Sequence, residues 1–160
     1  MSRVIAVANQ KGGVGKTTTN VNLSACLAVL GKRVLTIDID PQGNTTSGLG
    51  IDKNHAKYSI YDIIVNGVDA KDTILHTSVK NLDIIVSKIQ LAGAEIELVP
   101  MMAREMILKK ALADIKEDYE YILIDCPPSL GLITINALTA ADKLLVPIQC
   151  EYYALEGLTQ

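Results

Sequence analysis

Aromatic residues and basic charge are scarce in this sequence, and each shortage disfavours a class of function. The chain has no Trp and no Phe, so its aromatic rings come from six Tyr. Proteins that bind single-stranded nucleic acid usually stack the bases on aromatic rings, and this mode of binding is therefore disfavoured. The net charge of −3 likewise argues against a basic surface that coats nucleic acid, although it is compatible with a local basic patch.

Paired cysteines and long apolar runs are also missing. Cys26, Cys126 and Cys150 stand far apart without the spacing of metal ligands, so we interpret them as reduced, buried thiols of a cytosolic protein. The apolar run near the N-terminus stops at Asn9, which is too short for a signal peptide or a membrane span. No later run reaches spanning length, and we expect a cytoplasmic protein without membrane segments.

Apolar residues make up 49% of the 160 positions, which is enough for the core of one domain. Short runs that are apolar on both faces alternate with helical patterns, as is typical of a doubly wound α/β fold, a mostly parallel sheet with helices on both faces. Strands are predicted at residues 3–8, 33–38, 82–87, 121–125 and 143–148. Helices are predicted after the first strand up to residue 30, at 60–65, 91–99, 101–116 and 132–141, and from 154 onward, with a loop at 41–57.

A glycine-rich turn lies between the first predicted strand and the first predicted helix. Its residues are Lys11, Gly12, Gly13, Val14, Gly15, Lys16, Thr17 and Thr18. Glycines allow backbone N–H groups to converge on an anion, and the helix N-terminus adds a favourable dipole. We predict that the turn binds the phosphates of ATP or ADP, with Lys16 at the β and γ phosphates and the Thr17 hydroxyl on Mg²⁺. The usual pattern has Gly where Gln10 stands, and Lys11 is an additional lysine, so the turn is a deviant form.

Aspartates follow two of the predicted strands. Asp38 and Asp40 stand at the end of the second strand, and Asp125 ends the fourth. Open parallel sheets bind ligands at the carboxyl ends of their strands, where the glycine-rich turn also opens. We predict that Asp40 holds the water that attacks the γ-phosphate, that Asp38 tunes the magnesium shell, and that Asp125 acts on Mg²⁺ through a metal-bound water. The segment after Asp125 is expected to sense the γ-phosphate.

Three motifs together make the sequence similar to the ParA/Soj family of chromosome- and plasmid-partitioning ATPases. They are Ala8–Thr19 (ANQKGGVGKTTT), Asp38–Asn44 (DIDPQGN) and Asp125–Gly131 (DCPPSLG), and the stretch Glu151–Gly157 (EYYALEG) also resembles this family. A deviant phosphate loop alone would fit a wider class that includes MinD, the nitrogenase iron protein and bacterial tyrosine kinases. The combination is specific, and it covers most of the chain.

The resemblance implies a P-loop ATPase in which two subunits sandwich ATP. Lys11 would be the signature lysine that reaches the phosphates of the partner subunit, while Lys16 serves the nucleotide of its own subunit. Asp40 would position the hydrolytic water, and Asp125 would support Mg²⁺. The ATP-bound homodimer would bind duplex DNA of the nucleoid without sequence preference, and a ParB-type centromere-binding protein would stimulate hydrolysis and release it. A lysine supplied in trans would tie hydrolysis to assembly, as an arginine finger does.

Other interpretations stay open. Members of the ParA/Soj family are usually longer, and their C-terminal part carries adenine contacts and much of the DNA-binding surface. The apolar pattern runs to Gln160 without a stop signal, so we expect residues 1–160 to form a single domain that lacks a C-terminal portion. The alternative, a MinD-like ATPase at the membrane surface, would need a C-terminal amphipathic helix. A metallocluster protein would need paired cysteines, and a non-catalytic fragment would bind nucleotide poorly.

Overall fold

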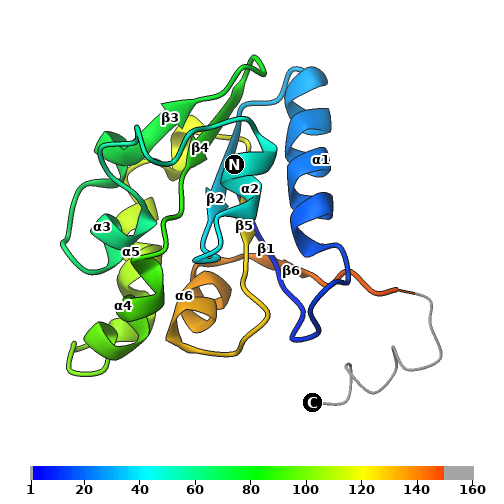
Figure 1. Cartoon of the computed structure of the whole chain (residues 1–160). Coiled ribbons are helices and arrows are strands. Elements are labelled where there is room, and N and C mark those ends of the chain that lie inside the picture. Colours follow the sequence, from blue (N-terminus) through cyan, green and yellow to red (C-terminus); the bar gives the residue numbers. More distant parts are fainter. Residues whose placement is uncertain (1, 150–160) are drawn as a thin grey trace.

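Six strands form a single sheet in the computed structural model, which describes residues 2–149 (Figure 1). In spatial order they are β3 (Ile74–His76), β4 (Leu82–Ile85), β2 (Val34–Asp38), β5 (Tyr121–Asp125), β1 (Arg3–Val7) and β6 (Lys143–Leu145). All neighbouring strands are parallel except the edge pair β3–β4. The doubly wound fold is confirmed, while the helix predicted from residue 154 and the stretch 151–157 lie outside the described residues.

Helices cover both faces of this sheet (Figure 1). They are α1 (Lys16–Val29), α2 (Asn44–Gly48), α3 (Ile60–Ile64), α4 (Leu91–Leu98), α5 (Ile107–Leu112) and α6 (Leu132–Ala140), with 3₁₀ turns at Ala70–Thr73, Arg104–Met106 and Lys116–Asp118. Leu123 of β5 packs in the cluster that α1 covers, whereas Ile122 and Ile124 pack with α3 to α6 on the other face. Strand side chains point alternately to the two faces, so a strand covered on both sides is apolar throughout.

The structure differs from the sequence prediction in the segment after β2. Residues 41–57, predicted as a loop, contain the helix α2. Gly43 precedes this helix with a φ of 66°, and Thr46 donates both its N–H and its hydroxyl to Asp38 at 2.8 Å. Threonine and serine are weak helix formers, so α2 depends on bonds to a residue outside the helix, which the local pattern does not reveal.

Further differences concern short segments. Strand β3 was absent from the sequence prediction, because it has three residues at the sheet edge and too little pattern to mark it. The helix predicted at 101–116 is formed only as α5, over 107–112. Ala103 has a φ of 51°, which a right-handed helix does not accommodate, and the chain therefore turns before α5 begins. The strand predicted at 143–148 is formed only over Lys143–Leu145, and the other predicted elements within residues 2–149 are present with ends that differ by one or two residues.

Helix α1 follows the glycine-rich turn, which begins at the carboxyl end of β1. It begins at Lys16 and ends before Gly31, whose φ of 82° is typical of a glycine that follows a helix C-terminus. The N–H of Gly31 donates to Ala28 at 2.9 Å and that of Lys32 to Leu27 at 3.1 Å, which satisfies two of the terminal carbonyls. None of the helices within residues 2–149 has the combination of length and apolar character that crossing a bilayer requires.

Candidate functional site

The loops that follow β1, β2 and β5, together with the start of α4, surround a cavity of about 720 Å³. Predicted site residues that line it are Gly12, Gly13, Gly15, Lys16, Thr17, Thr18 and Asp40. The remaining lining residues are Pro41, Gln42, Asn44, Ile89, Ala92, Pro127, Pro128 and Ser129. Segments that are far apart in the sequence thus meet at the carboxyl edge of the sheet, where the strand order predicts a ligand site.

The turn between β1 and α1 has a backbone shape suited to an anion. Gly13 and Gly15 have φ angles of 74° and 88°, a region that residues with side chains rarely adopt. Because α1 begins at Lys16, the N–H groups that a helix leaves without intrahelical partners lie in the part of the turn that lines the cavity. Lys16 is 7% exposed, and its Nζ donates to the carbonyl of Lys11 at 3.1 Å, which holds the ammonium group inside the turn.

Lys11 and Val14 belong to the turn but do not line the cavity. The backbone N–H of Lys11 donates to Oδ1 of Asn9 at 2.9 Å, and its carbonyl accepts from Lys16, so the backbone of Lys11 braces the turn. Val14 is buried beneath it. The predicted action of Lys11 in the site of a second subunit stays a prediction.

Asp125 is buried at the end of β5. Its Oδ2 accepts from the hydroxyls of Thr17 and Thr45, each at 2.8 Å, while the buried Oδ1 has no hydrogen-bond partner among the described residues. Burial raises the pKa of this carboxyl above its usual range, and the bonds from Thr45 and Thr17 partly oppose that shift. Hydrated Mg²⁺ prefers oxygen ligands. The unpartnered oxygen of Asp125 and the neighbouring hydroxyl of Thr17 are such ligands, so these residues fit the ion.

Asp38 lies beside Asp125, because β2 and β5 are paired with these two residues in register. Its Oδ2 accepts both bonds from Thr46, and its Oδ1 accepts from the N–H of Asp40 at 3.2 Å. Burial raises the pKa of Asp38 from 3.8 to about 6. Both carboxylate oxygens of Asp38 therefore accept bonds from the protein, and Asp38 does not line the cavity. The predicted role of Asp38 in the magnesium shell stays a prediction.

Asp40 is the carboxylate that lines the cavity. It is half-buried, and its Oδ1 accepts from the N–H of Gln42 at 2.9 Å. Its carbonyl accepts from the N–H of Gly43 at 2.9 Å, which closes a tight turn before α2. The carboxylate is thus held at the mouth of the loop after β2, and its role toward water stays a prediction.

Comparison with known proteins agrees with this geometry. The family model described as an AAA domain (AAA_31) matches residues 2–160. The chain belongs to this family. The sporulation initiation inhibitor protein Soj of Bacillus subtilis is 65% identical over 100% of the chain, and the chromosome partitioning protein ParA of Caulobacter vibrioides is 51% identical over 99% of it. The chain spans 63% and 60% of the length of these relatives, and the resemblance to the ParA/Soj ATPases is confirmed.

Solved structures of similar proteins contain adenine nucleotides. Cobyrinic acid a,c-diamide synthase from Mycobacterium smegmatis, with bound ATP analog and magnesium, is 44% identical with a TM-score of 0.95 over 100% of this chain and 65% of that chain. An ATP complex of an McdA variant from Cyanothece is 30% identical with a TM-score of 0.92 over 98% of this chain and 60% of that chain. Because these names denote different activities on one fold, function must be argued from the site.

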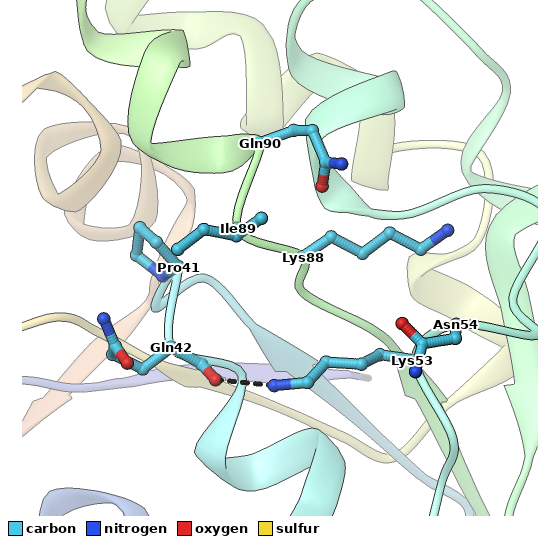
Figure 2. Close-up of a pocket in the computed structure, with 7 residues that line it drawn as sticks. All are labelled: Pro41, Gln42, Lys53, Asn54, Lys88, Ile89 and Gln90. Atoms are coloured by element: carbon cyan, nitrogen blue, oxygen red, sulfur yellow. Dashed lines mark hydrogen bonds between the residues drawn. The ribbon is translucent and has the colours of Figure 1, made fainter.

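A second hollow adjoins the nucleotide-sized cavity of this AAA domain. It has a volume of about 420 Å³ and shares Pro41, Gln42 and Ile89 with the first. Figure 2 shows its wall, where Nζ of Lys53 donates to the carbonyl of Gln42 at 2.8 Å. On the other side Lys88 donates to the carbonyl of Ala56. The two lysines thus tie the loop that carries Asp40 and the segment before α4 to the same stretch, residues 53–56.

Several lining and supporting residues of this AAA domain were not predicted from the sequence. Thr45 supports Asp125 from α2, a helix that the pattern did not reveal. Ile89 and Ala92 reach the cavity from a segment that is distant in sequence and carries no motif. The spacing Asp-Pro-Gln-Gly-Asn-Thr-Thr was the available signal for Thr45, since hydroxyls that directly follow a motif at a strand end are brought to the same edge.

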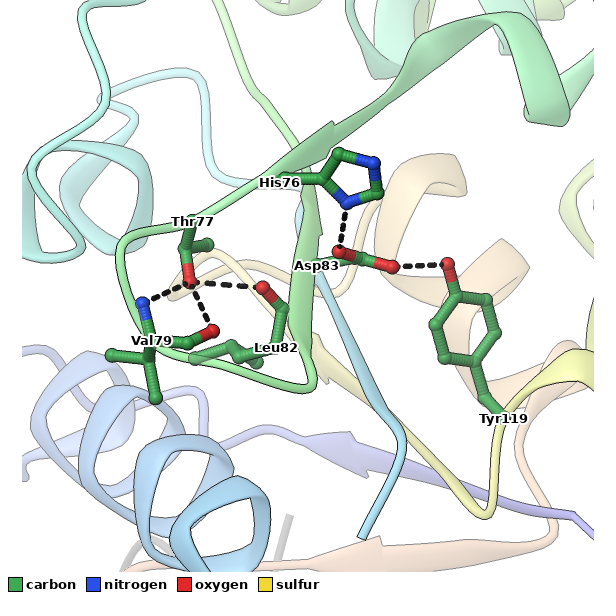
Figure 3. Close-up of polar contacts among 6 residues, drawn as sticks. All are labelled: His76, Thr77, Val79, Leu82, Asp83 and Tyr119. Carbon is green, nitrogen blue, oxygen red and sulfur yellow. Dashed lines mark hydrogen bonds and ion pairs between the residues drawn. The ribbon is translucent and has the colours of Figure 1, made fainter. Parts of the chain in front are cut away.

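Other titratable groups lie away from the cavity. Near the amino end of β4, Nδ1 of His76 pairs with Oδ1 of Asp83 at 2.7 Å, and the hydroxyl of Tyr119 donates to the other oxygen at 2.8 Å (Figure 3). The hydrogen bond to Asp83 raises the pKa of His76. Cys126 is buried beside Asp125, as predicted, and burial raises the pKa of its thiol, so it is poorly suited to bind a metal as thiolate. Cys26 is exposed, so the prediction of a buried thiol is wrong there, and Cys150 lies outside the described residues.

Proposed function

We propose that this chain is the nucleotide-binding part of a partitioning switch that binds and hydrolyses Mg-ATP. The observation that carries the proposal is the cavity at the carboxyl edge of the sheet, lined by the glycine-rich turn on one side and Asp40 on another. The positive φ angles of the turn, the buried ammonium of Lys16 and the start of α1 converge on this space. Together they suit the phosphates of ATP or ADP better than a neutral ligand.

Magnesium would be held by the hydroxyl of Thr17 and, through a water, by Oδ1 of Asp125. The hydroxyl of Thr17 already lies 2.8 Å from Oδ2 of the same carboxylate, so the two groups are in place together. Asp38 supports the site without facing the cavity, because its carboxylate accepts the bonds from Thr46 that hold α2 in place. When bound, the ion neutralises charge that develops on the phosphate oxygens during transfer.

Hydrolysis needs a positioned water and stabilisation of the transition state. Asp40 holds the attacking water in this proposal, since it is the carboxylate that lines the cavity. Lys16 stabilises the phosphates of its own subunit, and Lys11 supplies charge to the partner subunit when two copies sandwich ATP. A group supplied in trans accelerates phosphoryl transfer by about 10³–10⁵, so turnover would depend on assembly.

Partners follow from the relatives that are named as chromosome partitioning proteins. The ATP-bound homodimer binds duplex DNA of the nucleoid without sequence preference, and a ParB-type protein stimulates hydrolysis and so releases the dimer. Because the chain spans 63% of the Soj relative, these activities are proposed for a protein that contains it together with the remaining part.

The proposal is tested by measuring Mg-ATP binding and oligomeric state. We expect Mg-ATP to bind and to convert monomers into dimers in light scattering. Lys16→Ala should weaken binding at least about 100-fold, because two charge-assisted bonds are worth about 1.5–3 kcal/mol each. Lys71→Ala, which removes an exposed lysine remote from the cavity, is the matched control and should bind normally. Unchanged ATP affinity in Lys16→Ala would show that the turn does not hold the phosphates.

A further inference from the structure

Helix α6 is capped by a side chain that comes from a different helix. Glu95, in the middle of α4, accepts hydrogen bonds from the backbone N–H of Leu132 at 2.8 Å and of Ile133 at 3.3 Å. These are the first N–H groups of α6, which a helix leaves without internal partners. The residue before them, Gly131, has no side chain to bind them. A carboxylate at this position also complements the positive end of the helix dipole.

The close approach of Glu95 requires glycine at residue 131. A Cβ added to Gly131 would lie 2.1 Å from Oε1 of Glu95, well inside contact distance. The φ of Gly131 is −74°, so the backbone itself would accept any residue. Glycine is therefore needed at residue 131 to leave space for the Glu95 carboxylate, and not to allow an unusual backbone conformation.

The two segments that Glu95 joins both reach the candidate nucleotide site. Ile89 and Ala92, at the start of α4, line the cavity. So does the loop 127–129, which runs from β5 toward α6 and is tied to it by the bond from Thr134 to the carbonyl of Ser129 at 2.8 Å. Figure 1 shows α4 and α6 at the same end of the sheet. The bonds that Leu132 and Ile133 donate to Glu95 thus link the segments that form two walls of one cavity.

We propose that Glu95 is a positioning residue that couples the loop 127–129 to α4, so that a nucleotide in the cavity orders both segments together. The inference rests on the proposed function for the identity of the nucleotide, Mg-ATP. Without the Glu95 carboxylate, α6 loses its N-terminal acceptor and the loop before it gains freedom. A phosphate group that touched the loop would then no longer act on α4 through α6.

Hydrogen exchange of the whole chain, with and without Mg-ATP, tests this coupling. In Glu95→Ala we expect the amides of Leu132 and Ile133 to exchange about tenfold faster, as loss of a helix cap implies. Glu95→Gln keeps one acceptor oxygen and should restore part of the protection. Glu97→Ala removes a neighbouring carboxylate that bonds the exposed hydroxyl of Tyr61, and it should leave these amides unchanged.

Mg-ATP gives the readout that a purely structural cap would not move. In the wild type, Mg-ATP should protect residues 12–18, the start of α6 and α4. In Glu95→Ala it should still protect residues 12–18 but no longer protect residues 93–98, the part of α4 that does not line the cavity. If residues 93–98 keep their nucleotide-induced protection, Glu95 is only a cap and the coupling is refuted. If residues 12–18 show no protection in the wild type, the proposed nucleotide site fails instead.

A double-mutant cycle keeps the cap itself testable without nucleotide. Gly131→Ala should accelerate exchange at Leu132 in the wild-type background, because its Cβ displaces the carboxylate of Glu95. In the Glu95→Ala background the same change should have little effect, since the clash is gone. Equal effects in both backgrounds would overturn the clamp between Glu95 and Gly131.

Discussion

Asp38 and Asp125 form a pair of buried carboxyl groups, and this arrangement makes stability depend on pH in a specific direction. The two residues are opposite each other at the ends of β2 and β5. Burial is the main cause that raises the pKa of Asp38 to about 6, and the charge of Asp125 adds to it. Because the folded-state pKa lies above the unfolded value of 3.8, Asp38 contributes most stability below pH 3.8 and loses it as pH rises through 6.

The magnitude follows from the size of the shift. A change of about two pKa units corresponds to about 3 kcal/mol, of which about 2 kcal/mol falls between pH 4.5 and 7.5. Asp38→Asn removes the titration. Its carbonyl oxygen can keep the two bonds from Thr46, and the loss of the weak bond from Asp40 adds a cost that does not vary with pH.

Urea denaturation of wild type and Asp38→Asn at several pH values checks this reasoning. The free energy of unfolding of wild type minus that of the variant should fall by about 2 kcal/mol from pH 4.5 to 7.5. Asp142→Asn is the control, because the bond from the N–H of Val4 lowers the pKa of Asp142. The stability that Asp142 contributes is lost only as pH falls below 3.8. The free energy of unfolding of wild type minus that of Asp142→Asn should therefore stay level between pH 4.5 and 7.5. A level or rising difference for Asp38→Asn would refute the argument.

Three more predictions concern the site and its surroundings. Lys11→Ala should spare ATP affinity but abolish dimerisation and stimulated turnover in light scattering and phosphate-release assays; wild-type stimulated turnover would exclude a trans role. Asp40→Ala should keep ATP-bound dimers while hydrolysis falls at least about 100-fold, and rapid turnover would contradict it. His76 should titrate above its ordinary pKa by NMR and return to it in Asp83→Asn, so its stabilising pair is present at low pH and lost as pH rises through the raised pKa. An unchanged pKa in Asp83→Asn would disprove the pair.

The sequence predicts the parts of the fold that depend on periodicity and on glycine. Strand β5 is apolar on both faces because helices cover both, and Gly31 ends α1 because its φ is positive. Helix α2 was not predicted, because its Thr-rich sequence favours other conformations. The helix is held in place by the bonds from Thr46 to the buried carboxylate of Asp38. The break at Ala103, which has a positive φ, likewise has no local signal, because alanine is a good helix former.

Some residues of the candidate site could likewise be predicted from the sequence, and others could not. The glycine-rich turn and Asp40 line the cavity as their spacing indicates, because each lies where a parallel strand ends. Thr45 and Glu95 could not be predicted, since each acts on a residue brought near only by the fold. Side chains that hold other side chains leave no periodic pattern, whereas residues that shape the backbone around an anion do.

The buried polar residues behind the cavity indicate that a ligand binds at the carboxyl ends of the strands. Asn20 of α1 donates to the hydroxyl of Thr36 at 2.8 Å and to that of Thr45 at 3.4 Å, and Thr45 in turn donates to Asp125. Such a network costs free energy unless every member is satisfied, yet within residues 2–149 Oδ1 of Asn20 has no partner, and neither has Oδ1 of Asp125. A hydrated divalent cation would satisfy that oxygen of Asp125 and offset the repulsion from Asp38. Nucleotide with magnesium should therefore stabilise the folded chain beyond the contacts of the phosphates alone.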